Sequence, residues 1–321
     1  MLTAGLLLAG IAICVLGWRV GRRGRFWRKT AAAAAWLVAA LLLAAGGYRY
    51  WYFHRPLPSP VRRVLFDGVT HEREIRASPR PAILHVVTIN LDAPGIGLLV
   101  TPGEPANGRQ LRARTTSQFL QEFRVQVAIN GSFFHPWHAN GPLWYYPHVG
   151  DPVDVLGLTV SKGQPYSPAN PAHPTLYLTQ DNRAAIGHPL AQTWNALSGG
   201  PVLVEAGEVR HTAPGFGVGE PNPRTAVALD RSGRRLMLFV VDGRQPNYSE
   251  GVTLDELAQI VLEHGGHTAL NLDGGGSTTL AIEGPNGEPF VLNSPIHGRI
   301  PPGRERPIAN HLGIFARPAS R

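Results

Sequence analysis

The sequence predicts an α+β fold, with a mixed β-sheet core and a few helices, preceded by a transmembrane helical hairpin. Three observations predict it. Short apolar runs rich in Val, Ile, Leu and Thr alternate with Gly and Pro, which is typical of strands. Only two later segments carry the apolar stripe of an amphipathic helix. The first 55 residues combine long apolar runs with basic residues and contain no acid.

Two apolar stretches, Leu2–Trp18 and Ala31–Gly47, open the chain, and each has 17 residues without a charge. That length is at the short end of the ~17–25 residues that span a bilayer. Six Lys and Arg residues lie between them, and short cationic loops stay in the cytoplasm. We therefore expect residues 1–55 to anchor the chain in a bacterial inner membrane, with one domain, residues 56–321, on the periplasmic or extracellular side.

Two other interpretations of the N-terminus stay open. Residues 19–46 resemble a signal peptide, with a basic start, an Ala- and Leu-rich stretch and small residues before a cleavage point. A soluble hydrophobic hairpin is the other, although it would bury an Arg-rich turn. Both membrane interpretations export the rest of the chain, and export into an oxidising compartment suits a domain without cysteine.

The charge of the chain is unevenly distributed. Of the 30 Lys and Arg residues, eight lie in residues 1–55, so 22 remain in residues 56–321 to match all 22 Asp and Glu. A charge-balanced domain without a basic stripe argues against nucleic-acid binding, which the formal net charge of +8 would otherwise suggest. The single cysteine, Cys14, excludes an internal disulfide framework and a thiolate metal cluster.

Two helices and nine strands are predicted after the membrane segment. The helix over Thr253–His264 has a capping box at its start, one apolar stripe and Gly265 as its C-cap. Thr116–Phe123 is the second helix. We expect the Pro-rich region Trp137–Pro174 to be a long loop around the site. The predicted strands are Ala82–Leu91, Val125–Ile129, Gly157–Val160, Pro201–Val204, Thr225–Leu229, Arg235–Val241, Thr268–Leu272, Thr278–Ile282 and His311–Phe315.

The segment Ala269–Ser277 carries the most informative motif, a strand that ends in an Asn and an Asp and is followed by three glycines and a serine. Alternate residues of a strand point to the same side, so the two polar side chains would face one site. Glycines permit positive φ and close approach of a ligand, which can form an anion-binding concavity. An ordinary hairpin with a solvated Asp is the alternative. The candidate residues are Asn271, Asp273, Gly274, Gly275, Gly276 and Ser277.

The glycine motif does not match three better-known patterns. No Lys follows the glycines, as a Walker loop requires, and the alternating acidic ligands of an EF-hand are missing. Thr279 stands where a nucleophile elbow needs glycine. The spacing of His135, His138 and His148 does not complete a zinc motif, which favours a surface loop.

Other strand ends have a similar construction. Asn130 and Gly131 end a predicted strand and precede two Phe residues, and an apolar face with a fixed amide suits a sugar ring, although a core strand closing into a turn would look the same. The turn at Gly199 and Gly200 leads into another strand. Charged residues lie at further strand ends. An Arg beside glycine turns suits bidentate recognition of a phosphate, and the alternative is that the Arg forms an ion pair at the surface. These residues are Arg224, Asp242 and Arg244, with Arg306 and Asn310 as a further cation and amide.

Six motifs in this order resemble the phosphodiester glycosidase family. They read A-I-N-G-S-F-F, S-G-G-P-V-L, N-P-R-T-A-V-A, V-V-D-G-R, S-x-G-V-T-L-D-E-L-A and A-L-N-L-D-G-G-G-S-T-T, and the resemblance runs from about Val125 to Phe315. Residues 56–124 match loosely, and the membrane segment is an addition. The resemblance implies hydrolysis of the bond between a sugar C1 and a phosphodiester, with a phosphate-linked glycan as substrate.

We hypothesise roles for the residues at the site. The resemblance places there Asn130, Gly131, Arg224, Asp242, Asn271, Asp273, Gly275 and Ser277. Asp273 would activate water or attack C1, and Asp242 would be the second carboxylate, orienting the substrate or acting as an acid. Arg224 and the backbone amides of residues 274–276 would stabilise the departing phosphate. Asn130 and Asn271 would hold sugar hydroxyls. The sequence requires no cofactor and leaves open whether a divalent cation binds among the Asp and Asn oxygens.

Two other functions remain compatible with the residues. A membrane-tethered module that binds a phosphate-linked glycan would need the same recognition groups without catalysis, although two candidate carboxylates favour an enzyme. A phosphodiesterase that cleaves the P–O bond instead of the sugar C1–O bond is the other. Peptide hydrolysis is disfavoured because no Ser or Cys shares a motif with a His.

Overall fold

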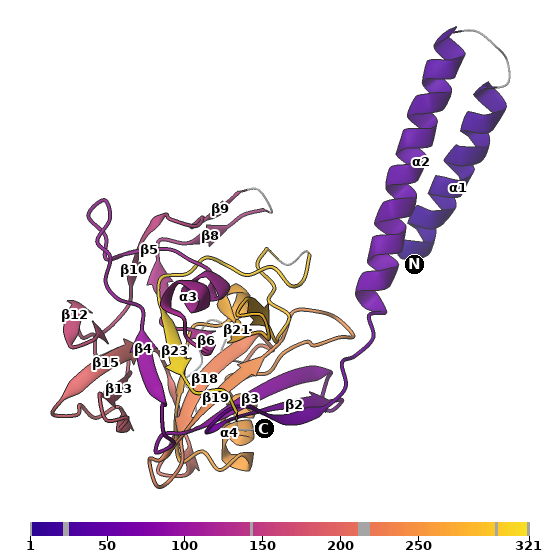
Figure 1. The fold of residues 1–321 in the computed structure, drawn as a ribbon. Helices are drawn as coiled ribbons and strands as arrows, with labels where there is room; N and C mark the ends of the chain where they lie inside the picture. The colour runs from indigo at the N-terminus through magenta and orange to yellow at the C-terminus, as the bar shows by residue number, and fades with distance from the viewer. Residues whose placement is uncertain (1, 22–25, 142–143, 211–218, 299–300, 320–321) are drawn as a thin grey trace. The chain divides into compact units, whose positions relative to one another are not determined.

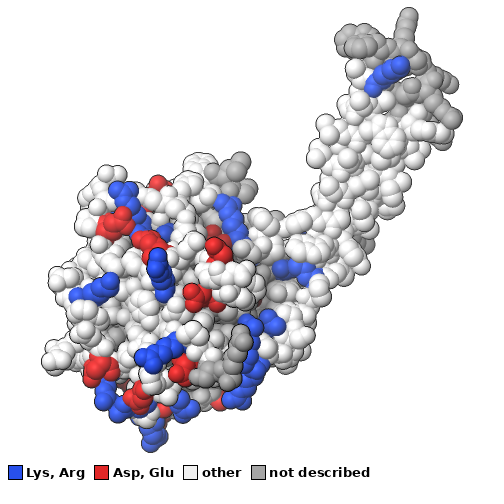
Figure 2. Space-filling model, in the orientation of Figure 1, with Lys and Arg blue, Asp and Glu red and all other residues white. Residues whose placement is uncertain are grey.

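The computed structural model describes residues 2–21, 26–141, 144–210, 219–298 and 301–319. It divides into two compact units, Met1–Leu57 with Pro246–Tyr248, and the rest of the chain. In the described residues the chain is mostly β-sheet, with four α-helices (Figure 1). Figure 2 shows Lys, Arg, Asp and Glu mixed over the visible face of the larger unit, as its balanced charge leads one to expect.

The N-terminal unit consists of two apolar helices, α1 (Leu2–Gly21) and α2 (Phe26–Phe53). They pack closely, because a Cβ atom on Gly10 would lie 2.8 Å from a carbon of Leu43. The segment Lys29–Phe53 of α2 is long and apolar enough to cross a membrane, whereas the apolar part of α1 is shorter. The structure therefore supports one candidate membrane span, and the predicted transmembrane hairpin stays a proposal.

The larger unit is built around an eight-stranded antiparallel sheet. Side chains alternate between its two faces in β18, where Val227 points into the central core and its neighbours Ala226 and Ala228 point to the opposite face. In spatial order its strands are β1 (Val61–Phe66), β2 (Val69–Arg76), β3 (Ala82–Asn90), β19 (Arg235–Val241), β18 (Arg224–Leu229), β20 (Thr268–Asn271), β16 (Val202–Glu205) and β17 (Glu208–Val209).

Two five-stranded sheets supply the other wall of the central core. Ile129 and Leu312 from one, and Leu176 and Leu197 from the other, join Val227 in a single buried cluster. The first sheet contains β22 (Pro289–Val291), β21 (Leu280–Glu283), β6 (Val127–Asn130), β23 (His311–Phe315) and β4 (Gly97–Val100). The second contains β12 (Gln164–Ser167), β11 (Thr159–Ser161), β15 (Thr193–Ser198), β13 (Thr175–Thr179) and β14 (Ala184–Ile186).

Small sheets and two helices complete the unit. Helix α4 (Leu254–Glu263) covers the outer face of the eight-stranded sheet through Leu257 and Val261, and α3 (Thr116–Phe123) packs through Phe119 on the sheet that contains β6. Both helices begin with a capping box, as predicted for α4. The small sheets are β5 (Leu111–Arg112) with β10 (Pro152–Val155) and β7 (Phe134–His135), and β8 (His138–Ala139) with β9 (Tyr145–Tyr146).

Two expectations about the fold were wrong. Every strand pair within the described residues is antiparallel, so the sheet is not mixed, because hairpins and long returns connect the strands instead of parallel crossovers. The region Trp137–Pro174, predicted as a loop, contains β8 to β12. Only β11 was predicted, as the strand Gly157–Val160, because the other four are short or Pro-punctuated and lack a clear alternation. Strands β1 and β2 were also not predicted, because their many Arg and Glu residues interrupt the alternation of apolar and polar residues that is typical of a strand.

A pair of buried histidines lies in the eight-stranded sheet. Nε2 of His71 in β2 lies 3.0 Å from Nδ1 of His85 in β3, and both side chains are 1% exposed. Burial lowers the pKa of His71 to about 4, with Arg63 and Arg73 adding to the effect. Burial, then His71 and Arg73, likewise hold the pKa of His85 well below its usual range. Both rings are therefore neutral in the folded protein.

We predict that this pair makes the protein less stable in acid. Below pH ~6.5 the histidines become protonated in the unfolded protein but stay neutral in the folded protein. The free energy of unfolding therefore decreases as the pH is lowered, until the pH reaches the pKa of the folded histidines. Denaturant unfolding at pH 7 and pH 5 measures the loss, which we expect to be about 1–3 kcal/mol smaller in a His71→Leu/His85→Leu variant. Equal losses in the two proteins would contradict the prediction.

Candidate active site

Several predicted residues meet at one end of the eight-stranded sheet. Arg224 at the start of β18 pairs with Val241 at the end of β19, and Ala226 pairs with Asn271 at the end of β20. Continued by two residues, this register sets Asp273 opposite Arg224. The N–H of Gly200 donates to the carbonyl of Asn271 at 2.7 Å, which adds the glycine turn before β16. Four segments far apart in the sequence thus converge.

Asn130 connects this sheet end to the neighbouring sheet. Its Nδ2 donates to the carbonyl of Asp273 at 2.6 Å, and its Oδ1 accepts from Thr225 Oγ1 at 2.7 Å and from the N–H of Thr279 at 3.2 Å. The N–H of Asp273 in turn donates to the carbonyl of Gly131 at 3.1 Å. The fully buried Asn130 amide therefore fixes the start of the glycine turn.

Two of the three consecutive glycines each leave room for one arginine, and the first leaves room for a backbone carbonyl. A Cβ atom on Gly275 would lie 3.1 Å from Nη1 of Arg244, and one on Gly276 would overlap Nη2 of Arg306. A Cβ atom on Gly274 would lie 2.8 Å from the carbonyl of Pro223 and 3.9 Å from Cδ of Arg224. Gly275 also has a φ of 62°, in the left-handed region that favours glycine.

The backbone amides of this turn are mostly used within the protein. The N–H of Gly274 donates to Oδ1 of Asp273 at 2.9 Å, and the N–H of Gly275 donates to the carbonyl of Pro223 at 2.9 Å. Residues Gly275–Ser277 form a turn of 3₁₀ helix. An anion at this turn would therefore be held mainly by the guanidinium groups, and less by the amides than the sequence suggested.

Two of the arginines are anchored from outside the turn, and Arg306 is anchored by a serine within it. Nε of Arg224 donates to the carbonyl of Val252 at 3.1 Å, and Nε of Arg244 donates to Oδ1 of Asn222 at 2.8 Å. Nη1 of Arg306 donates to Oγ of Ser277 at 3.2 Å. Burial lowers the pKa of Arg224 to about 10, and the charge of Arg244 adds to the effect while that of Glu220 opposes it.

Asp273 is the carboxylate that faces this cluster. Burial raises the pKa of its carboxyl group above the usual range, while Arg306, the Ser277 hydroxyl, the Gly274 N–H and Arg244 act in the opposite direction. The residue as a whole is nevertheless only half-buried. A carboxylate with a raised pKa, close to fixed cations and reached by solvent, has the properties of a general base or nucleophile.

Asp242 lies at the end of β19 but in a different environment. Its side chain is 2% exposed, and its carboxylate accepts from the N–H of Ser294 at 2.8 Å and from Nδ2 of Asn293 at 3.0 Å. Its carbonyl accepts from Oγ of Ser249 at 2.6 Å. Asp242 thus connects the segment after β22 to the loop after β19. Arg244 follows two residues later in this loop.

Asn271 presents a buried acceptor beside the turn. Its Nδ2 donates to the carbonyl of Gly200 at 2.7 Å, whereas its Oδ1 has no hydrogen-bond partner among the described residues. A buried acceptor without a partner costs about 1–3 kcal/mol, which a ligand hydroxyl or N–H would recover. A side chain on Gly199 would collide with the Asn271 carbonyl, so the glycine turn permits this close approach.

Two residues of the site were not found by sequence reasoning. His297 is 2% exposed, and its Nδ1 accepts from Nε of Arg306 at 3.4 Å. The Arg306 guanidinium lies over the ring of Trp137, 5.2 Å from its centroid. Neither His297 nor Trp137 belongs to a motif, and only their proximity in space to Arg306 reveals them. In the described part of the chain, no three His, Cys, Asp or Glu side chains gather as metal ligands would.

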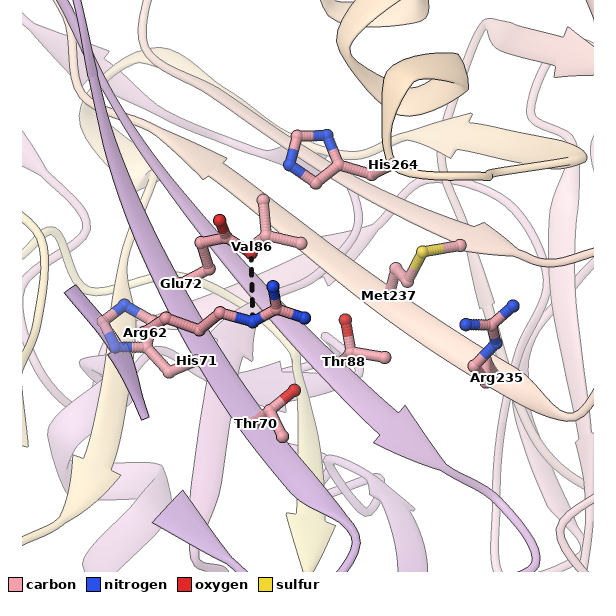
Figure 3. Close-up of a pocket in the computed structure, with 9 residues that line it drawn as sticks. All are labelled: Arg62, Thr70, His71, Glu72, Val86, Thr88, Arg235, Met237 and His264. Carbon is pink, nitrogen blue, oxygen red and sulfur yellow. Dashed lines mark ion pairs between the residues drawn. The ribbon is translucent and has the colours of Figure 1, made fainter. Parts of the chain in front are cut away.

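The cavity drawn in Figure 3 is separate from these residues. It has a volume of about 300 Å³ and opens on the outer face of β1, β2, β3 and β19, beside His264 at the end of α4. Arg62 crosses it and pairs with Glu72 at 3.9 Å, with Thr70 and Thr88 below (Figure 3). None of the predicted site residues lines this cavity, so we do not assign the proposed chemistry to it.

The chain is similar in sequence to known proteins. Over 209 residues the chain is 25% identical to the N-acetylglucosamine-1-phosphodiester alpha-N-acetylglucosaminidase of Bos taurus, a match that covers 58% of this chain and 36% of that protein. It is 43% identical over 61 residues to the Homo sapiens protein of the same name, covering 19% and 11%. The chain thus spans about a third, or less, of these relatives.

Solved structures share the fold. A hypothetical protein from Synechocystis has a TM-score of 0.61 at 18% identity and covers 81% of this chain and 64% of its own. The zebrafish N-acetylglucosamine-1-phosphodiester alpha-N-acetylglucosaminidase catalytic domain, auto-inhibited by its pro-peptide, has a TM-score of 0.58 at 22% identity, covering 84% and 86%. The phosphodiester glycosidase family model matches residues 123–315. The chain therefore belongs to the phosphodiester glycosidase family.

Proposed function

We propose that the domain hydrolyses the bond between C1 of a sugar and the phosphate of a sugar-1-phosphodiester. The observation that carries the proposal is the glycine turn at residues 274–276, where the guanidinium groups of Arg244 and Arg306 act on Asp273 and the strand register sets Arg224 opposite it. The names of the relatives indicate N-acetylglucosamine-1-phosphodiesters as the first substrates to test. Such a diester carries one negative charge, and its phosphate gains a second as it leaves.

The charge of the turn matches this change. The two guanidinium groups of Arg244 and Arg306 outweigh the one carboxylate of Asp273, and this positive charge suits a phosphate monoester better than a neutral leaving group. Planar guanidinium groups also bind phosphate oxygens in pairs. A phosphate monoester leaves easily, so the site needs less help from a general acid than an ordinary glycosidase does.

Asp273 would act on the sugar side of the bond. As a base it takes the proton of a water whose oxygen bonds to C1, while the C1–O bond breaks and its electrons stay on the phosphate. As a nucleophile it would attack C1 itself before water completes the reaction. In both cases the products are the free sugar, the phosphate monoester and one proton.

The remaining predicted residues then divide into two groups. Asn271, with its unpartnered Oδ1, would bind a hydroxyl or N–H of the sugar. Asn130 and Asp242 would position the site, because their polar atoms already bind the turn at Asp273 and the segment at Ser294. This assignment moves Asn130 away from sugar binding and Asp242 away from acid catalysis.

The N-terminal helices support a proposal for location. Helix α2 would anchor the chain in a bacterial inner membrane, α1 would complete a hairpin, and the domain would lie on the periplasmic or extracellular side. The cationic residues between the two apolar stretches support this orientation. A cleaved signal sequence would export the domain as well, but without an anchor.

We predict that Asp273→Asn lowers kcat/KM by at least about 10²-fold, because a positioned base or nucleophile is typically worth ~10²–10⁴ in rate. The assay measures free sugar released from an N-acetylglucosamine-1-phosphodiester, with circular dichroism to confirm folding. Asp181→Asn is the matched control, since that carboxylate is largely exposed. More than about a tenth of the wild-type activity in Asp273→Asn would refute the assignment.

A topology assay tests the location. Alkaline phosphatase fused after residue 321 should be active, because it folds only outside the cytoplasm, and the intact mass of the purified protein should include residues 1–55. An inactive fusion would contradict export. An active fusion whose mature chain begins near residue 47 would replace the anchor with a cleaved signal.

A further inference from the structure

Arg306 lies between the glycine turn and the loop that contains Trp137. On one side its guanidinium contacts Gly276 and donates to Oγ of Ser277 at 3.2 Å. On the other side it lies over the ring of Trp137, 5.2 Å from the centroid. At this distance a guanidinium and an indole attract each other.

His297 holds the same guanidinium from a third direction. Its Nδ1 accepts from Nε of Arg306 at 3.4 Å, and its ring lies edge-to-face with Tyr145 at 4.6 Å. Burial lowers the pKa of His297 to about 4, and the charges of Arg306 and Arg304 and the neighbouring His148 contribute. The ring is therefore neutral near pH 7 and can accept at Nδ1.

We propose that Trp137 and His297 are positioning residues, which hold the Arg306 guanidinium against the Asp273–Ser277 turn so that it can act on Asp273 and on the leaving phosphate. The kinetic part of this inference rests on the proposed function. Three contacts hold Arg306: its Cζ lies over the Trp137 ring, its Nε donates to His297, and its Nη1 donates to Ser277. A long arginine side chain would otherwise lose this geometry to rotamer freedom.

Loss of this support would raise the pKa of Asp273. Arg306 is the strongest of the groups that counter the effect of burial on its pKa, ahead of Ser277, the Gly274 N–H and Arg244. If Arg306 moves away, those three groups remain and the carboxyl group becomes harder to ionise. The fraction of active carboxylate then falls at acidic pH, and activity is lost at a higher pH than in the wild type.

The test uses the full chain in detergent and two pairs of variants. Trp137→Ala removes the ring, whereas Trp137→Phe keeps an aromatic face for the guanidinium. His297→Leu removes the acceptor, whereas His297→Asn keeps one. Trp144→Ala is the matched control, because Trp144 lies in the same loop region and is 70% exposed. The substrate is N-acetylglucosamine-1-(methyl phosphate), whose methyl group offers no ring for Trp137 to stack on.

Two measurements are made on each variant. The first is kcat/KM against pH. The second is an NMR titration of ¹³Cγ-labelled aspartate, with the Asp273 signal assigned from its absence in Asp273→Asn, and it requires no activity. We expect Trp137→Ala and His297→Leu to raise the titration midpoint of Asp273, shift the acidic limb upward and lower kcat/KM by roughly 10–10²-fold. The Phe and Asn variants should restore most of both properties.

The outcomes separate this inference from the proposed function. If the wild type releases no sugar but Trp137→Ala still raises the Asp273 midpoint, the proposed function fails and the positioning stands. If the wild type is active and Trp137→Ala behaves like Trp144→Ala in both measurements, the positioning is overturned. A change in KM alone, with the Asp273 midpoint unmoved, would overturn it as well and assign Trp137 to substrate contact.

Discussion

Two glycines let the guanidinium groups of Arg244 and Arg306 approach one turn of the chain, and the rest of the site depends on that close approach. A side chain at Gly276 would occupy the space of Arg306, and one at Gly275 would crowd Arg244. Burial and the charge of Arg244 lower the pKa of Arg224, and a backbone carbonyl and a side-chain amide fix these two cations separately. Asp273 offsets part of this charge, and an anionic substrate would offset more.

The fold places this turn through a small number of buried hydrogen bonds. The eight-stranded sheet brings the ends of β18, β19 and β20 together, and Asn130 joins them to the neighbouring sheet. A buried amide with three partners is costly to disturb, because each broken bond would leave a buried polar group unpaired. Stability and function are therefore linked at Asn130, whereas Asn271 retains an acceptor that only a ligand would use.

Sequence reasoning succeeded where the signal is local. The capping box at Thr253, the strands Arg235–Val241 and His311–Phe315, and the glycine motif at Asp273 all lie in short, regular patterns. It failed where the cause is tertiary. Strands β8, β9, β10 and β12 have no clear period of their own and form because neighbouring strands pair with them. Trp137 and His297 acquire their place only when distant loops bring them to Arg306. The family resemblance supplied the reaction, which no pattern of residues alone could have specified.

The proposed function requires cleavage of the phosphodiester at its sugar C1–O bond. Hydrolysis of an N-acetylglucosamine-1-phosphodiester in ¹⁸O-labelled water, followed by mass spectrometry of both products, tests this most directly. The account predicts that the heavy oxygen appears in the C1 hydroxyl of the released sugar and that the phosphate monoester keeps only its original oxygens. Heavy oxygen in the phosphate would show attack at phosphorus, and the arginine-lined turn would then belong to a phosphodiesterase.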